Sequence, residues 1–173
     1  MREYEPPFRT GYWRTVSALV WVFIVIAWLV SIFSIVQEMC MATACNDAVS
    51  FTFFGINLGW LGIIYFSLLL ILLWLRTRQI LLNWALAAMV FAGVGAELRL
   101  LWIQKYVIGG WCPLCVSICC ALFCAAVLLL FERNQALESE VTGKRNLLRW
   151  LVLILVMIAS GLSVAILGVK ALE

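Results

Sequence analysis

Long apolar stretches alternate with short polar connections along almost the whole chain. Five of these stretches reach the length of about 20 residues that a helix needs to cross a hydrocarbon core about 30 Å thick. They lie at residues 15–37, 57–75, 80–104, 112–131 and 148–168. The pattern therefore predicts an all-α integral membrane protein with five transmembrane helices.

The connections between these helices leave little room for another domain, so we expect residues 1–173 to form a single membrane domain. The first span is too long for a signal peptide and has no small-residue cleavage site. Only Val169 to Glu173 follow the last span, so we expect any soluble partner to be a separate polypeptide. The expected parts are a cytoplasmic N-terminal segment (1–14), the first four helices (15–131), a cytoplasmic loop (132–147) and the fifth transmembrane helix (148–168).

The composition of the 173 residues agrees with a lipid environment. Hydrophobic residues make up 66% of the chain, charged residues 12%, and the mean hydropathy is +1.09. The net charge of +3 is too small to indicate nucleic acid binding. The chain has no histidine, which excludes histidine-ligated haem, the usual histidine zinc sites and Ser-His-Asp or Cys-His catalysis.

Basic residues are distributed unevenly between the two sides of the predicted membrane domain. One side holds Arg2, Arg9, Arg14, Arg76, Arg78, Arg133, Lys144, Arg145 and Arg149. The other side holds only Arg99, Lys105 and Lys170. Because cytoplasmic loops retain Lys and Arg, this distribution predicts a cytoplasmic N-terminus and, with five spans, a C-terminus on the outer side.

Four of the seven cysteines fall on the predicted outer side. Cys40 and Cys45 lie between the first and second spans, and Cys112 and Cys115 open the fourth. That compartment is oxidising, and paired cysteines there form either structural disulfides or redox couples. The Cys-x-x-Cys pair begins a helix with Pro113 at its first position. Free backbone N–H groups and the positive end of the helix dipole favour the thiolate there, which favours a redox couple.

Other uses of the cysteines stay open. The two cysteine pairs also fit static disulfides or a metal site with four thiolate ligands. The redox interpretation involves no metal. Cys119, Cys120 and Cys124 lie deeper in the fourth span, where thiols usually serve as small apolar side chains. They allow an alternative function as a carrier that hands a soft metal ion from the loop cysteines into the membrane. A structural membrane protein with static disulfides is the third interpretation.

Three segments carry a more specific pattern. They are Cys40 to Cys45 followed by Asn46-Asp47, Gly55-Ile56-Asn57-Leu58 leading to Gly62, and Gln104 to Cys115 with Gly109-Gly110-Trp111-Cys112-Pro113-Leu114-Cys115. Together they resemble the vitamin K epoxide reductase (VKOR) family over residues 15–131. The resemblance is to bacterial or archaeal homologues that work like the DsbB quinone reductases, here without the fused thioredoxin-like domain.

The resemblance implies a fold and a function. The fold is a four-helix bundle around a quinone, with the first outer loop covering it and the fifth helix packed outside. The function is that of a membrane thiol–disulfide oxidoreductase that supports disulfide bond formation. The implied partners are a separate thioredoxin-fold (DsbA-like) protein, the membrane quinone pool (ubiquinone or menaquinone) and the lipid bilayer. The implied location is the cell inner membrane, with the active cysteines on the periplasmic side.

The resemblance also implies a role for each of the four outer cysteines. Cys40 would exchange disulfides with the partner, and Cys45 would pass electrons to Cys112. Cys115 would face the quinone. Each transfer is a thiol–disulfide exchange, so its direction depends on the reduction potentials of the two couples.

Several further residues are candidates for the quinone pocket. Asn57, at the outer end of the second span, is the best candidate to orient a quinone carbonyl, and capping that helix is its equal alternative. Cys119 stands where the animal enzymes have a tyrosine that contacts vitamin K, which favours simple quinone reduction over epoxide reduction. Glu97 and Arg99 lie inside the third span, where ionisable residues are functional candidates. Glu97 is a candidate proton relay, with a structural role as its alternative.

Overall fold

The computed structural model describes residues 11–39, 51–53, 55–76, 80–138 and 143–171. Its long helices are α1 (Gly11–Met39), α3 (Leu58–Leu75), α4 (Ile80–Ile103), α5 (Pro113–Glu138) and α6 (Gly143–Gly168). They supply five segments long and apolar enough to cross a membrane, namely Thr15–Val36, Leu58–Leu75, Leu82–Val107, Pro113–Glu132 and Trp150–Gly168. The predicted all-α membrane architecture with five spans is thereby confirmed.

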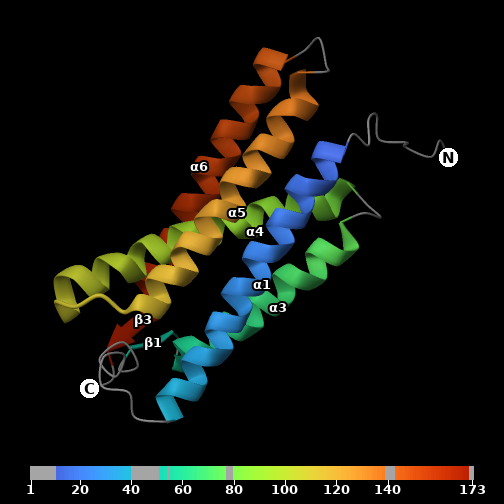
Figure 1. Cartoon of the computed structure of the whole chain (residues 1–173). Helices are drawn as coiled ribbons and strands as arrows, with labels where there is room; N and C mark the ends of the chain where they lie inside the picture. Colours follow the sequence, from blue (N-terminus) through green and yellow to red (C-terminus); the bar gives the residue numbers. More distant parts are fainter. Residues whose placement is uncertain (1–10, 40–50, 54, 77–79, 139–142, 172–173) are drawn as a thin grey trace.

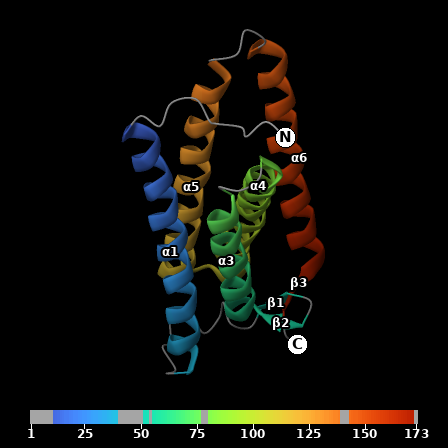
Figure 2. The same ribbon diagram turned by 90° about the vertical axis from the view of Figure 1, so that its right-hand side faces the viewer.

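Successive helices run in opposite directions, with α4 inclined to the others (Figures 1 and 2). The starts of α1, α4 and α6 share one end of the molecule with Arg76, which we call the Arg76 end. The starts of α3 and α5 share the opposite end with Cys112, which we call the Cys112 end (Figure 1). Which of these ends faces the cytoplasm stays a prediction from the Lys and Arg distribution.

The helices pack through an apolar core and expose apolar outer faces. The most extensive contacts join α4 to α6 and α1 to α5, and α1 also packs along α3. The largest fully buried side chains include Ile24 of α1, Phe66 and Leu69 of α3, Leu86 of α4 and Leu122 of α5. Large apolar side chains such as Ile64, Leu155 and Leu167 are exposed on the outside. Outward apolar faces suit contact with lipid rather than water, which agrees with a multi-pass membrane protein.

Small residues bring α4 and α6 close together. A Cβ atom at Gly161 of α6 would overlap the backbone carbonyl of Ala92, and one at Gly95 of α4 would overlap the carbonyl of Ile158. Such close backbone approach is how membrane helices gain packing energy without a hydrophobic driving force between them. The small residues of the third span therefore hold α6 against α4.

A small sheet that the apolar pattern did not predict lies at the Cys112 end. Its strands are β1 (Phe51–Phe53), β2 (Ile56–Asn57) and β3 (Val169–Ala171), in the order β2-β1-β3 with both pairs antiparallel. Gly55 turns the chain between β1 and β2 with φ 82°, a conformation that glycine adopts without steric cost. Strand β3 thus joins the end of α6 to the connection between the first two spans.

The segment 132–147, predicted as a loop, is mostly helical. Helix α5 continues to Glu138 and α6 already begins at Gly143, and residues 139–142 lie outside the described residues. The residues after the fourth span include Glu, Arg, Gln, Ala and Leu, which are good helix formers. The length of an apolar stretch shows where a helix can cross lipid. The helix propensity of the residues that follow allows the same helix to continue beyond the membrane.

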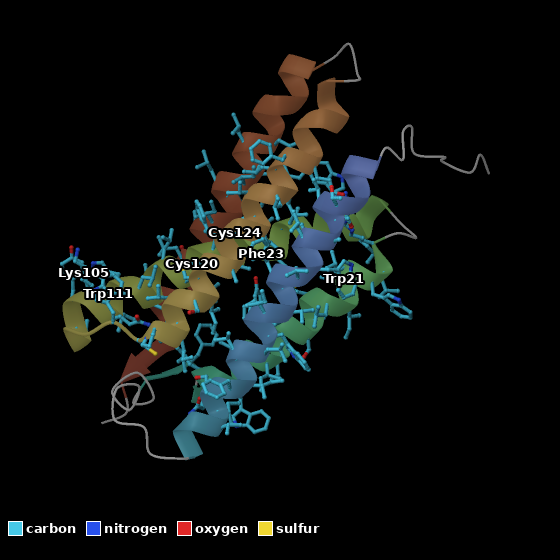
Figure 3. All side chains as sticks on the ribbon, viewed as in Figure 1. Trp21, Phe23, Lys105, Trp111, Cys120 and Cys124 are labelled. Atoms are coloured by element: carbon cyan, nitrogen blue, oxygen red, sulfur yellow. The ribbon has the colours of Figure 1, made fainter. Side chains whose placement is uncertain are left out.

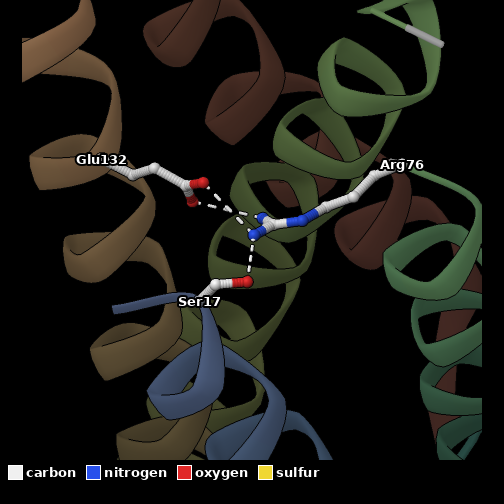
Figure 4. Close-up of polar contacts among 3 residues, drawn as sticks. All are labelled: Ser17, Arg76 and Glu132. Atoms are coloured by element: carbon white, nitrogen blue, oxygen red, sulfur yellow. Dashed lines mark hydrogen bonds and ion pairs between the residues drawn. The ribbon is translucent and has the colours of Figure 1, made fainter. Parts of the chain in front are cut away.

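An ion pair joins three helices at the Arg76 end (Figure 4). Arg76 follows α3 directly and contacts the Glu132 carboxylate of α5 through two N–O distances of 3.2 Å. The same guanidinium donates a hydrogen bond to the hydroxyl of Ser17 in α1 at 2.5 Å. The Arg76 side chain is only 9% exposed and that of Glu132 is 21% exposed. The two charges therefore interact away from most of the solvent.

Replacing Arg76 by Met is expected to lower the free energy of unfolding by about 1–2 kcal/mol, because Glu132 loses its counterion in a partly buried place. Thermal unfolding of the detergent-solubilised protein, followed by circular dichroism, measures the change. The double variant Arg76→Met with Glu132→Leu should regain part of the loss, since no charge is then left unpaired. An unchanged unfolding temperature for the single variant would show that the pair does not stabilise the fold.

Candidate functional site

The chain reverses direction between α4 and α5 through a π-helical turn, η1 (Gln104–Ile108). Gly109 follows with φ 73°, a left-handed conformation that ends the turn. The backbone N–H of Gly110 then donates to the carbonyl of Gln104 at 3.2 Å. This closed turn leads the chain back to the start of α5.

Cys112 precedes the first residue of α5, as the sequence predicted. The helix begins at Pro113, and the carbonyl of Cys112 accepts from the backbone N–H of Val116 at 3.1 Å. The backbone N–H of Cys112 donates to the side-chain oxygen Oε1 of Gln104 at 3.4 Å. Gln104 is buried, at 3% exposure, and was not predicted as a site residue. The sequence did contain a signal for this role, because Gln104 is a polar amide near the end of an apolar stretch, eight residues before Cys112.

The two thiols of the Cys-x-x-Cys pair lie together at the start of α5, with Cys112 just before the helix and Cys115 on its first turn. Cys112 is buried, at 5% exposure, and Cys115 is partly buried. The Cys115 thiol is in hydrogen-bonding contact with Cys112 and with the side chain of Gln104. The structure thus places the predicted pair where a membrane-spanning helix begins, with one sulfur shielded from solvent.

The other cysteines of α5 do not join this pair. Cys119 is partly buried one turn further along, Cys120 is exposed, and Cys124 is partly buried (Figure 3). Among the residues that the structure describes, no three Cys, His, Asp or Glu side chains lie close enough together to hold a metal ion. The arrangement along α5 therefore gives no specific support to the soft-metal alternative.

Cys40 and Cys45 lie outside the described residues, so their predicted pairing stays a prediction. The elements that flank them can be placed, because α1 ends at Met39 and β1 begins at Phe51. Both of these points lie at the Cys112 end (Figure 1). The chain thus leaves and re-enters the described structure on the side where Cys112 and Cys115 lie.

Asn57 caps the N-terminus of α3. Its side-chain oxygen accepts a hydrogen bond from the backbone N–H of Gly59 at 2.8 Å. This is the alternative role that the sequence left open, and it satisfies one of the free N–H groups at the helix start. The quinone-orienting role of Asn57 stays a prediction.

A cavity of about 340 Å³ lies between α3, α4 and α6 at the Cys112 end. Phe53 of β1 and Val169 of β3 close it on the side of the sheet. Most of the wall is apolar, and the small residues that leave the space open include Gly62, Ala92, Gly93, Ala96 and Gly161. Cys115, Cys119 and Asn57 do not belong to the described part of the wall. The cavity is thus separate from the residues predicted to contact the quinone.

Three polar side chains face this cavity, namely Tyr65 of α3, Glu97 of α4 and Ser160 of α6. Glu97 is also close enough to interact electrostatically with Cys115 and Cys119. Glu97 thus belongs to the cavity wall and also lies within electrostatic range of Cys115. The neighbouring Arg99 instead places its guanidinium 4.4 Å from the centre of the Trp102 ring.

Comparison with known proteins does not assign the chain to a family. No family model and no curated protein matches the sequence. The resemblance to the VKOR family therefore stays a prediction that depends on the residues quoted for it. A function for this chain must accordingly be argued from the cysteine pair and the cavity.

Proposed function

We propose that the protein is a membrane thiol–disulfide oxidoreductase that reoxidises a separate thioredoxin-fold protein and passes the electrons through two cysteine pairs to a membrane quinone. The observation that carries the proposal is the Cys112–Cys115 pair at the start of a membrane-spanning helix. At this position the sulfurs lie near the end of the span, between the aqueous side and the lipid. A redox couple there can connect a soluble donor with a lipid-soluble acceptor.

The burial of Cys112 supports a relay of two pairs. Thiol–disulfide exchange requires a thiolate to attack a disulfide sulfur directly, and a folded soluble partner has poor access to a buried sulfur. We therefore assign the first exchange to Cys40, which forms a mixed disulfide with the partner and frees Cys45. The Cys45 thiolate then attacks Cys112 in the Cys112–Cys115 disulfide and frees Cys115. The second thiolate of the partner attacks the mixed disulfide, which releases the oxidised partner and the Cys40 thiolate. Cys40 then attacks Cys45 in the Cys45–Cys112 disulfide and frees Cys112, so two electrons have moved to the Cys112–Cys115 pair.

The residues of the cavity fit a quinone. Its volume of about 340 Å³ lies at the lower end of the range of about 300–1,000 Å³ that is usual for small-molecule sites. The apolar wall suits a ring that dissolves in lipid, and Tyr65 and Glu97 offer polar contacts for its oxygens. A quinone bound there supplies the chemistry of an acceptor for two electrons and two protons. The chain contributes the shape of the site, its apolar wall and Glu97, which lies within electrostatic range of Cys115.

Replacing Cys40 by Ala separates the two halves of the relay. Purified protein is supplied with a reduced thioredoxin-fold donor or with a small dithiol, and quinone reduction is followed by absorbance. With the protein donor the variant should lose about a hundredfold in rate, whereas with the dithiol, which reaches the inner pair, it should stay near the wild-type rate.

Cys124→Ala is the matched control, because Cys124 takes no part in the relay and should leave both rates unchanged. An unimpaired Cys40→Ala variant with the protein donor would refute Cys40 as the entry point. Wild-type protein that reduces no quinone with either donor would refute the proposed function. Metal analysis of the same preparation then tests the soft-metal alternative.

A further inference from the structure

Among the described polar side chains that line the cavity, only one is free to donate a hydrogen bond to a ligand, because the others donate to the protein backbone. The hydroxyl of Tyr65 donates to the backbone carbonyl of Met89 at 2.8 Å. The hydroxyl of Ser160 donates to the carbonyl of Met157, also at 2.8 Å. A hydroxyl has a single proton to donate, so both groups offer the cavity only their acceptor lone pairs. Among the described lining residues, Glu97 is then the remaining polar side chain, and it donates when it is protonated.

This pattern of donors and acceptors selects the kind of ligand. A lipid acyl chain has no polar atom to pair with Glu97, which would leave a polar group unsatisfied inside the membrane domain. A quinone is a flat apolar ring with carbonyl acceptors on its edge, so it needs a donor and little else. Its reduced form carries hydroxyl donors, which the oxygens of Tyr65 and Ser160 can accept.

We infer that the cavity between α3, α4 and α6 is the binding site for the quinone ring, and that Glu97 donates a hydrogen bond to a quinone carbonyl and transfers a proton to it. This inference rests on the proposed function and adds to it the place of the site and the acid. It places the site on a wall that includes the fifth membrane helix but not Asn57 or Cys119.

The proton transfer balances with the thiol chemistry. When Cys112 and Cys115 close to a disulfide, the pair loses two electrons and two protons. Glu97 gives its proton to an acceptor oxygen and takes up the proton of the Cys115 thiol, with which it interacts electrostatically. The acceptor takes its second proton from the Cys112 thiol. Glu97 ends in the protonation state in which it began, and the quinone leaves as the hydroquinone.

Equilibrium binding tests the site without relying on activity. The probe is ubiquinone with one isoprene unit, titrated into detergent-solubilised protein while the quenching of tryptophan fluorescence is recorded. Glu97→Leu should weaken binding about tenfold, because it removes the donor. Glu97→Gln should bind like the wild type, because its amide N–H groups still donate. Ser163→Ala is the matched control on the same helix and should also bind normally, because Ser163 donates to the carbonyl of Ala159 and does not line the cavity.

Turnover tests the proton transfer separately. Glu97→Gln should slow quinone reduction with the small dithiol about a hundredfold, the usual effect of losing a general acid, although its binding is intact. Ala96→Leu, which places a larger side chain on the cavity wall, should weaken binding of the same probe.

The outcomes separate the inference from the function on which it rests. If wild-type protein reduces quinone and Glu97→Leu binds the probe normally, or Glu97→Gln turns over normally, the inference is overturned and the cysteine relay stands. If wild-type protein neither binds nor reduces the probe, both are overturned. Loss of binding in Glu97→Leu together with slow turnover in Glu97→Gln supports the site and the acid.

Discussion

Cys115→Ala is expected to lose at least about a thousandfold in the rate of quinone reduction, with a protein donor and with a small dithiol alike. Without the second thiol, Cys112 cannot close an intramolecular disulfide, so the two electrons have no route from the inner pair to the acceptor. The rate is measured from quinone absorbance with purified protein in detergent. The loss with both donors contrasts with that of Cys40→Ala, which should affect the protein donor alone.

Trapped intermediates give this prediction a second readout. In Cys115→Ala, the Cys112 thiolate can attack Cys45 of the Cys40–Cys45 disulfide and release Cys40. The resulting Cys45–Cys112 disulfide has no Cys115 to resolve it, so in the absence of reductant it should be detectable by mass spectrometry of proteolytic peptides. Cys120→Ala is the control on the same helix, because Cys120 is exposed and away from the pair. If Cys115→Ala changed only the unfolding temperature and left turnover intact, the pair would be structural, as the static-disulfide interpretation holds.

The membrane helices could be predicted because the signal for them is local. A helix in lipid must satisfy its own backbone groups and present apolar side chains along about 20 residues, so span length can be read directly from the chain. The start of α5 followed from equally local chemistry, since Pro113 suits the first helical position and Cys112 precedes it. The close contact of α4 with α6 depends on Gly95 and Gly161, and the sequence did not indicate that these two glycines lie on facing helices.

Features that depend on contacts between distant residues could not be predicted. The pairing of β1 with β3 joins Phe51–Phe53 to Val169–Ala171, more than a hundred residues apart. Arg76 was counted only as a basic residue near a membrane surface, because nothing local shows that Glu132 lies beside it. In the sequence, Gln104 is only a polar residue near the end of an apolar stretch. In the folded chain, the turn that ends at Gly109 brings its side chain to the backbone N–H of Cys112.

The cavity needed the same tertiary information. Whether Tyr65 and Ser160 donate into it or away from it depends on which backbone carbonyls their helices bring within reach. Glu97 was visible as an ionisable residue inside a span, and the sequence could name it as a candidate. Its place on the cavity wall came only from the packing of α4 against α3 and α6.

Gly161→Ala is expected to lower the free energy of unfolding by about 2–3 kcal/mol, the upper part of the usual range for overpacking. The added methyl group would overlap the backbone carbonyl of Ala92, which no rotamer change can relieve. Alanine also raises helix propensity by up to about 1 kcal/mol, so the measured loss is net of that gain. Thermal unfolding in detergent should show a midpoint lowered by about 5–10 °C.

Gly110→Ala is the matched control, because the same methyl group there meets no atom within 4 Å. Equal unfolding temperatures for the two variants would contradict the close packing of α4 and α6. The effect should extend to ligand binding, because Glu97 is carried by α4 and Ser160 by α6 on opposite sides of the cavity wall. Forcing these helices apart widens the cavity, so Gly161→Ala should weaken binding of the short-chain ubiquinone even at temperatures where the protein stays folded.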